Sequence, residues 1–275
     1  MTGKALASGE SRAEIELWLA ELNLGMPPFL QDALQRVVQE GSLGYGRPDP
    51  IADAALCEHL RSRFSWELAP ESLLWIPGVV PALLVAIETF VTPGGAVLVP
   101  TPAYPPMLRG PAQVGRELQT FPLREIGGRY LPVAEDLVRA IRPNTQALLL
   151  CNPHNPTGSL WRPAELEALL AVARDAGLTV LVDEVHSDLV LDPPDHRFLA
   201  SLRRPGDPPC VTFLSPGKAY AATGLACGIV VVQEEGSRHA LQKACRDRIG
   251  SPNVLARVAG RAAYLHGEAW RTELL

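Results

Sequence analysis

The chain has 275 residues, of which 47% are hydrophobic, 20% charged and 6% aromatic, and its formal net charge is −5. This composition supports a large buried core and excludes global disorder, and the mild acidity without a basic cluster gives no support for nucleic-acid binding. Five scattered cysteines without CxxC spacing favour reduced thiols in the cytoplasm over disulfides or a zinc site. No apolar run is long enough to predict a membrane span.

The start of the chain is predicted to form two helices separated by a turn. A helix is expected from Pro28 to Glu40, with Gly41 as its stop. The Gly- and Pro-rich stretch 44–50 breaks the pattern, and a second helix is expected over 51–65. We place the domain boundaries to give an N-terminal segment, 1–44, a large domain, 45–248, and the start of a small C-terminal domain, 249–275, that is truncated.

Beyond residue 65, short apolar runs alternate with segments of helical periodicity. Continuous apolar runs of this kind are typical of strands buried on both faces, as in a parallel sheet covered by helices. The sequence therefore predicts an α/β fold with a mostly parallel sheet. The expected strands are 73–76, 96–100, 147–151, 178–183, 211–214 and 227–232, and the expected helices are 79–90, 163–176, 234–249 and one beginning at 252.

Groups of polar or turn-forming residues follow four of these strands, at the edge where open α/β sheets bind ligands. The first group is Pro77-Gly78-Val79-Val80, where a glycine opens a helix. The free main-chain N–H groups and the dipole of that helix could hold a phosphate, although a tight strand-to-helix turn is the simpler interpretation. The second group contains Asn155, in a loop that two Asn-Pro pairs restrict. Asn155 could donate to a phenolate oxygen on a cofactor.

The third group, Asp183-Glu184-Val185-His186, ends an apolar strand. A buried carboxylate needs a cationic partner, and either a protonated pyridine nitrogen or a core arginine could provide one for Asp183. A metal site in this run is disfavoured because neighbouring residues on a strand point to opposite faces. His186 could donate a hydrogen bond near the cofactor ring or simply pack.

The fourth group, Ser215-Pro216-Gly217-Lys218, presents one amine in a turn after a buried strand. Lys218 could form a Schiff base with pyridoxal phosphate or be a solvated surface lysine, and Ser215 could bind the phosphate. Tyr104, after the strand 96–100, could stack on a flat heterocycle or be an ordinary half-buried tyrosine. Taken together, the four groups predict a pyridoxal 5'-phosphate site, because that cofactor accepts electrons through a protonated ring.

These motifs resemble a known family. Asn155-Pro156-Thr157-Gly158, Asp183-Glu184-Val185-His186 and the Ser215…Lys218 turn are similar to the fold-type I pyridoxal phosphate enzymes of the class I/II aminotransferase group. Within that group the chain most resembles the MalY/PatB-type cystathionine β-lyases, because His186 stands where aminotransferases usually carry tyrosine. The run Asn152-Pro153-His154 and the run from Thr101 to Tyr104 strengthen this resemblance.

The resemblance implies a role for each candidate residue. Lys218 would be the catalytic Schiff-base lysine, Asp183 the partner of the pyridine nitrogen, and Asn155 the contact of the ring hydroxyl. By the same resemblance the remaining residues would contact the ring (Tyr104, His186) or the phosphate (Gly78, Val79, Ser215). Tyr45 would reach the phosphate of a neighbouring subunit, which implies a homodimer with shared sites.

The chain also departs from the family pattern. Gly217 replaces a serine that usually provides a phosphate hydroxyl, Ala221 stands where many relatives have asparagine, and Ala226 where aminotransferases have a phosphate-binding arginine. The lyase branch tolerates the loss of that arginine. Family members continue past the equivalent of Leu275 into the small domain that holds the arginine for the substrate carboxylate.

Three functions remain open from the sequence. The leading one is β-elimination, in which Lys218 removes the Cα proton of a cysteine S-conjugate such as cystathionine and a thiol, pyruvate and ammonia result. The second is amino-group transfer to a keto acid. The third is a truncated, inactive chain that at most binds the cofactor or a partner subunit.

Overall fold

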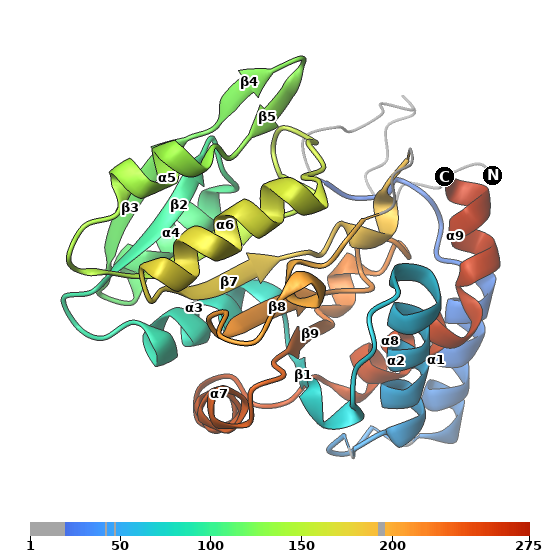
Figure 1. Ribbon diagram of the computed structural model, residues 1–275. Helices are drawn as coiled ribbons and strands as arrows, with labels where there is room; N and C mark the ends of the chain where they lie inside the picture. Colours follow the sequence, from blue (N-terminus) through green and yellow to red (C-terminus); the bar gives the residue numbers. More distant parts are fainter. Residues whose placement is uncertain (1–19, 42, 47, 192–195) are drawn as a thin grey trace, which may run out of the picture.

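The computed structural model describes residues 20–41, 43–46, 48–191 and 196–275. The described strands form one seven-stranded sheet and one hairpin (Figure 1). The sheet contains β1 (Leu73–Ile76), β2 (Ala96–Thr101), β3 (Glu117–Pro122), β6 (Thr145–Cys151), β7 (Thr179–Asp183), β8 (Cys210–Leu214) and β9 (Gly228–Val231), and the hairpin contains β4 (Arg124–Ile126) and β5 (Arg129–Leu131). The helices are α1 (Pro28–Glu40), α2 (Pro50–Phe64), α3 (Val79–Phe90), α4 (Pro105–Gln113), α5 (Ala134–Ala140), α6 (Pro163–Asp175), α7 (Glu235–Arg248), α8 (Val254–His266) and α9 (Glu268–Leu274).

The order of the strands in the sheet is β1-β9-β8-β7-β6-β2-β3. The pairs from β8 to β3 are all parallel, and β9 is antiparallel to both β1 and β8. Two antiparallel pairings restore the direction, so β1 runs parallel to β8. The carboxyl ends of β1, β2, β6, β7 and β8 therefore lie at one edge of the sheet, and the predicted mostly parallel sheet is confirmed.

Helices cover both faces of the sheet, which explains why the central strands are apolar throughout. One core cluster joins α3 and α7 to the sheet, with Leu83, Leu149 and Leu241 among its buried members. The other joins α2 and α6 to the opposite face, with Leu56, Leu148 and Leu169 among its members. In Figure 1 the helices α5 and α6 lie in front of the sheet and α3 lies behind it.

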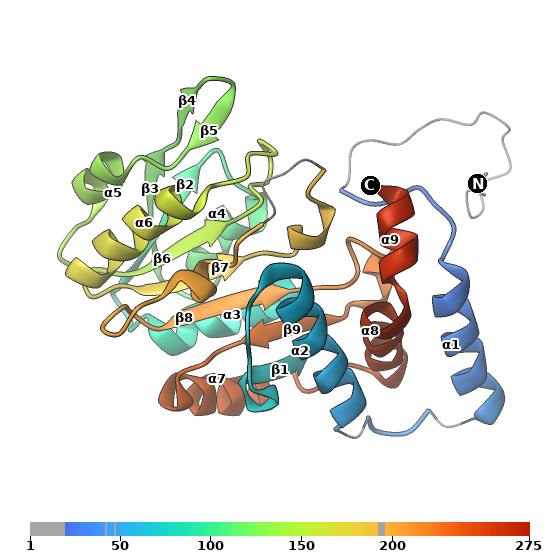
Figure 2. The same ribbon diagram turned by 45° about the vertical axis from the view of Figure 1, so that its right-hand side comes forward.

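Four helices gather beyond the β1 end of the sheet. Helices α1 and α2 both pack against α8, and α9 follows α8 directly (Figure 2). Residues from the two ends of the described chain therefore form one layer, in which Leu30 of α1 packs with Ala259 and Ala262 of α8. No helix in the described part of the chain combines the length and the apolar character needed to cross a bilayer.

The predicted elements agree with the structure to within a few residues at each end. The bounds of β1 and α3 are those expected, and Gly41, at φ 66°, ends α1 in the left-handed conformation that favours glycine. The edge strand β3, the hairpin β4–β5 and the helices α4 and α5 were not predicted. The single C-terminal helix expected from residue 252 is two helices, α8 and α9, which meet at Gly267.

Candidate functional site

A pocket of about 660 Å³ opens at the carboxyl edge of the sheet. Its walls come from the segments that follow β1, β2, β6, β7 and β8, the strand ends that the parallel topology brings together. All of the predicted site residues except Tyr45 line this pocket. They are Gly78, Val79, Tyr104, Asn155, Asp183, His186, Ser215 and Lys218.

Tyr45 lies apart from these residues, in the connection between α1 and α2. Its side chain is fully exposed and does not line the pocket. Its predicted contact with a neighbouring subunit stays a prediction, since the structure contains one chain.

Lys218 is half-buried in the pocket wall. The residues on both sides of it are buried, namely Pro216, Gly217 and Ala219. The turn after β8 therefore fixes the main chain at Lys218, and the contacts of the Lys218 side chain determine where that side chain points. The Nζ atom donates a hydrogen bond of 2.8 Å to the main-chain oxygen of Ala20. The described residues provide no carboxylate partner for it within salt-bridge distance, so the amine is available to a ligand.

Asp183 ends β7 with its side chain only 6% exposed. Its Oδ1 accepts a 3.2 Å hydrogen bond from the main-chain N–H of Val185, and no ion pair joins it to another described residue. Burial raises the pKa of Asp183 to about 6, although the Val185 hydrogen bond and the charge of Lys218 act in the opposite direction. A buried carboxylate facing a pocket without an ion-pair partner suits a cationic ligand atom.

Two further groups beside Asp183 are kept uncharged. Burial, together with the charge of Lys218, lowers the pKa of His186 to about 4, so its imidazole is neutral at physiological pH. Burial and the nearby Asp183 raise the pKa of the Cys151 thiol well above its ordinary value. Cys151 pairs directly with Asp183 across the β6–β7 ladder and also lines the pocket. Lys218 and Asp183 are therefore the groups of opposite charge within the described wall.

The opposite wall is the N-terminus of α3. Gly78 precedes the helix with φ 124° and ψ 146°, a conformation that residues with a side chain rarely adopt. The main-chain N–H groups of Val79 and Val80 are the first two of the helix and have no partner within it. Because Gly78 and both valines line the pocket, this end of α3 can receive an anion.

Ser215 lines the pocket but uses its hydroxyl within the turn. The Oγ atom donates to the main-chain oxygen of Cys227 at 2.7 Å and accepts from the N–H of Gly217 at 3.1 Å. A Cβ at Gly217 would lie 3.1 Å from the Cα of Thr223 and 3.2 Å from Ser215 Oγ. The glycine in place of a serine therefore allows a close approach between the Lys218 turn and the 3₁₀ turn Thr223–Leu225.

The loop after β6 holds Asn155 through its neighbours. Asn152 is fully buried, and its Oδ1 accepts from the main-chain N–H of Trp161 at 2.9 Å. His154 stacks on the Trp161 ring, with 5.2 Å between ring centroids, and its Nδ1 contacts Thr157 Oγ1 at 2.9 Å. These contacts fix the main chain on both sides of Asn155, which faces the pocket. Tyr104, half-buried before α4, forms another part of the wall.

The structure adds pocket residues that the sequence patterns did not indicate. Ala20 and Thr223 line the pocket, and Thr223 Oγ1 donates to Glu21 Oε1 at 3.0 Å. The segment that begins at Ala20 thus crosses the mouth beside Lys218. Cys227, which directly precedes β9, lines the wall as well. No local motif signals these residues, because they meet the site through the tertiary fold alone.

The fold and this wall define a member of a known class: a family model described as "Aminotransferase class I and II" matches residues 20–266, and the chain belongs to that family. Among its relatives is the cystathionine beta-lyase PatB of Bacillus subtilis, which is 33% identical over 95% of this chain and 68% of the relative. The crystal structure of OvoB has a TM-score of 0.90 at 33% identity and covers 94% of this chain and 69% of that one.

A third similar protein, whose crystal structure has been solved, is a PLP-bound putative aminotransferase from Clostridium difficile 630. It has a TM-score of 0.89 at 28% identity and covers 94% of this chain and 67% of its own. The chain thus spans about two thirds of the length of these three proteins. The predicted resemblance to the class I/II aminotransferase group and to the PatB branch is confirmed.

Proposed function

We propose that the pocket binds pyridoxal 5'-phosphate and that the protein is a carbon–sulfur β-lyase acting on cystathionine or related cysteine S-conjugates. The observation that carries the proposal is that a half-buried lysine, Lys218, and a buried carboxylate, Asp183, line the same pocket at the sheet edge. PatB, which is named a cystathionine beta-lyase, favours the lyase activity, and the PLP-bound C. difficile protein favours the cofactor.

The residues present fit this cofactor. When bound, pyridoxal phosphate supplies an aldehyde for amino groups and a ring that accepts electrons released at the substrate Cα. Asp183 would hold the ring nitrogen in its protonated form, which suits a buried carboxylate without an ion-pair partner among the described residues. Asn155 would donate to the ring hydroxyl and Tyr104 would stack on the ring. His186, being neutral, would donate or accept a hydrogen bond near the ring without adding charge.

The N–H groups of Val79 and Val80, with the dipole of α3, would hold the phosphate. Gly78 would let the phosphate approach these N–H groups closely. Its φ of 124° is a value that residues with a side chain rarely adopt, so a glycine suits this position. Ser215 would contribute a phosphate bond only by releasing the carbonyl of Cys227, so we assign it first to holding the turn.

Lys218 would carry the cofactor and then act as the base. Once a substrate amine takes its place, the freed Nζ receives the proton from the substrate Cα, the Cβ–S bond breaks, and the thiolate leaves with the electron pair. Hydrolysis of the remaining three-carbon unit gives pyruvate and ammonia. Overall, one cysteine S-conjugate and one water yield a thiol, pyruvate and ammonia, and no keto acid is consumed.

We further propose a cytoplasmic homodimer in which the exposed Tyr45 contacts the phosphate of the partner. Its complete exposure and the five unpaired cysteines support this proposal. The division into segments 1–44, 45–248 and 249–275 also stays a prediction.

Turnover without an acceptor tests the function. The purified protein, reconstituted with pyridoxal phosphate, is expected to form pyruvate and a free thiol from cystathionine with no keto acid present. If turnover instead requires an added keto acid and converts it into an amino acid without releasing a thiol, the protein is an aminotransferase, the alternative that the C. difficile structure represents. A bound cofactor with neither product would indicate an inactive cofactor-binding chain.

A further inference from the structure

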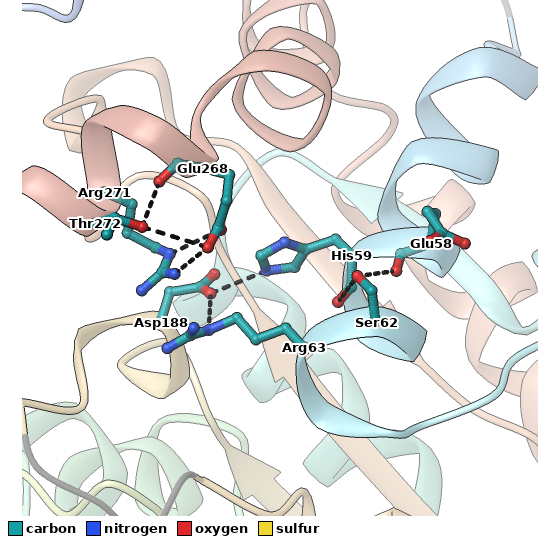
Figure 3. Close-up of polar contacts among 8 residues, drawn as sticks. All are labelled: Glu58, His59, Ser62, Arg63, Asp188, Glu268, Arg271 and Thr272. Carbon is teal, nitrogen blue, oxygen red and sulfur yellow. Dashed lines mark hydrogen bonds and ion pairs between the residues drawn. The ribbon is translucent and has the colours of Figure 1, made fainter.

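An ionic cluster around the buried side chain of Asp188 holds the segment that follows β7. The segment continues from His186 into a short 3₁₀ turn, Ser187–Leu189, and the Asp188 side chain points toward His59 and Arg63 of α2 (Figure 3). Its Oδ1 lies 2.9 Å from Nε2 of His59 and 3.6 Å from Nε of Arg63. The side chains of Asp188 and His59 are 9% and 8% exposed, so this contact is made away from solvent.

Asp188 is an ionised carboxylate in spite of its burial. Burial alone would raise the pKa of Asp188, but the hydrogen bond from His59 and the charges of Arg271 and Arg63 lower it below its usual value. A buried charge held by several partners resists displacement, because any movement leaves the charges uncompensated in a poorly solvated place.

The C-terminal helix joins the same cluster. Arg271 of α9 is 3% exposed, and its guanidinium donates two hydrogen bonds to the carboxylate of Glu268 one turn earlier. Figure 3 shows both side chains beside Asp188, opposite His59 and Arg63. The cluster therefore connects α2, the turn after β7 and α9.

The turn after β7 transmits this anchoring to the pocket. The main-chain N–H of Ser187 donates to the oxygen of Glu184 at 3.1 Å, and that of Leu189 donates to the oxygen of His186 at 2.9 Å. Leu189 packs against Ala219 and Tyr220, the two residues that follow Lys218. A shift of Asp188 would thus move His186 and the Lys218 turn relative to Asp183, which the sheet holds separately.

We propose that Asp188, held by His59 and Arg63, is a positioning residue that sets the geometry of His186 and Lys218 around the cofactor. The inference rests on the proposed function, because it assumes that the pocket takes pyridoxal phosphate. The Asp188 side chain itself does not line the pocket, so its influence is exerted through the turn.

Two matched substitutions separate positioning from general stability. Asp188→Asn removes the anion and keeps the size. Asp136→Asn does the same to another buried aspartate. Asp136 lies in the first turn of α5, forms an ion pair with Arg124 of β4, and does not line the pocket. Both variants are expected to lower the melting temperature, since each leaves a cation without its partner.

The cofactor readouts are expected to differ between the two variants. Asp188→Asn should raise the dissociation constant for pyridoxal phosphate about tenfold and shift the pH midpoint of the visible absorbance of the holoprotein by about 0.5 unit or more. Asp136→Asn should change neither. Fluorescence titration of the cofactor-free protein gives the first quantity, and a spectral pH titration gives the second.

A conservative variant guards against misfolding. His59→Ala removes the donor to Asp188 and should weaken cofactor binding, whereas His59→Gln retains an N–H donor and should restore most of the affinity. If Asp188→Asn folds, an unchanged cofactor affinity and an unchanged pH midpoint would overturn the inference. If Asp188→Asn does not fold, equal cofactor affinities of His59→Ala and His59→Gln would overturn it. Failure of the wild-type protein to bind pyridoxal phosphate would instead overturn the proposed function, and the inference with it.

Discussion

The Nζ atom of Lys218 lies 2.8 Å from the main-chain oxygen of Ala20, so the first described residue meets, at the pocket, a lysine that lies 198 positions later in the chain. A carbonyl oxygen is a neutral hydrogen-bond acceptor, so this contact leaves the positive charge of the Lys218 amine uncompensated. The amine can therefore exchange this contact for a bond to a ligand. We expect the Ala20 segment to influence access to Lys218.

Lys218→Ala should abolish covalent cofactor binding. The variant should lose the visible absorbance band of the reconstituted protein, release pyridoxal phosphate on dialysis, and lose about 10²-fold or more in lyase rate, since a positioned base contributes on that scale. Lys243→Ala, an exposed lysine on α7, serves as the control and should behave like the wild type. An intact band in the Lys218 variant would show that another amine holds the cofactor.

The cofactor-free protein should lose stability as the pH rises through the pKa of Asp183. That pKa is about 6 in the folded protein, against an ordinary value of 3.8, so the folded state holds the proton more tightly between these values. Stability is therefore greatest below the unfolded value and declines as the carboxylate ionises. Asp183→Asn removes this cost. The difference in free energy of unfolding, variant minus wild type, should therefore be about 2 kcal/mol higher at pH 7.5 than at pH 4.5, in the direction of a more stable variant.

Urea unfolding of both proteins at the two pH values measures this difference. A stability gap that does not change with pH would mean that Asp183 ionises normally. The same substitution should weaken pyridoxal phosphate binding, because an amide cannot neutralise a protonated ring nitrogen.

Gly267, between α8 and α9, should not tolerate a methyl group. A Cβ there would lie 2.3 Å from the Tyr220 ring and 2.4 Å from the main-chain oxygen of Ala263. Gly267→Ala should lower the free energy of unfolding by about 1–3 kcal/mol through overpacking. Gly236→Ala in α7, where a Cβ would meet nothing within 4 Å, should be neutral or stabilising. Thermal unfolding of both variants provides the comparison, and equal shifts would contradict the predicted close packing.

Ala221 lies at φ 50°, in the left-handed region that favours glycine and asparagine. Ala221→Gly relieves this strain and should raise the free energy of unfolding by up to about 1 kcal/mol after the entropy cost of glycine is counted. Ala222→Gly, at φ −129°, has no such strain to relieve and should be destabilising. Chemical denaturation should give opposite signs for the neighbouring substitutions. A loss of stability in both would indicate that the turn is relaxed.

Most of the pocket could be predicted from the sequence because each wall segment directly follows an apolar strand. Lys218, Asp183 and Asn155 carry local signals, and the parallel topology brings their strand ends to one edge. The edge strand β3 escaped prediction because its burial alternates and it lacks the continuous apolar run of the central strands. The hairpin strand β4 has three exposed residues, of which only Ile126 is apolar, so it gives no strand pattern.

The residues that the sequence analysis missed depend on distant contacts. Ala20 has no side-chain chemistry that marks it, and His59 sits in α2 like any other helical residue. Its partner Asp188 lies 129 positions later in the chain, so no local pattern joins them. Ser215 was predicted from its residue type to bind the phosphate. The structure shows that its hydroxyl donates instead to the main-chain oxygen of Cys227, a contact that the sequence does not indicate.

The place of β1 in the sheet has a consequence for synthesis on the ribosome. Residues 73–76 pair with 228–231, so the strand that leads into Gly78 cannot join the sheet until the chain has been made through Val231. Chains fold from the N-terminus as they emerge, and long-range strand pairing is slow. The wall at the N-terminus of α3, which we propose holds the phosphate, should therefore take its place after the strands that carry Asn155, Asp183 and Lys218 have been translated. A nascent chain arrested before β9 should fail to retain pyridoxal phosphate, even though it already contains Lys218.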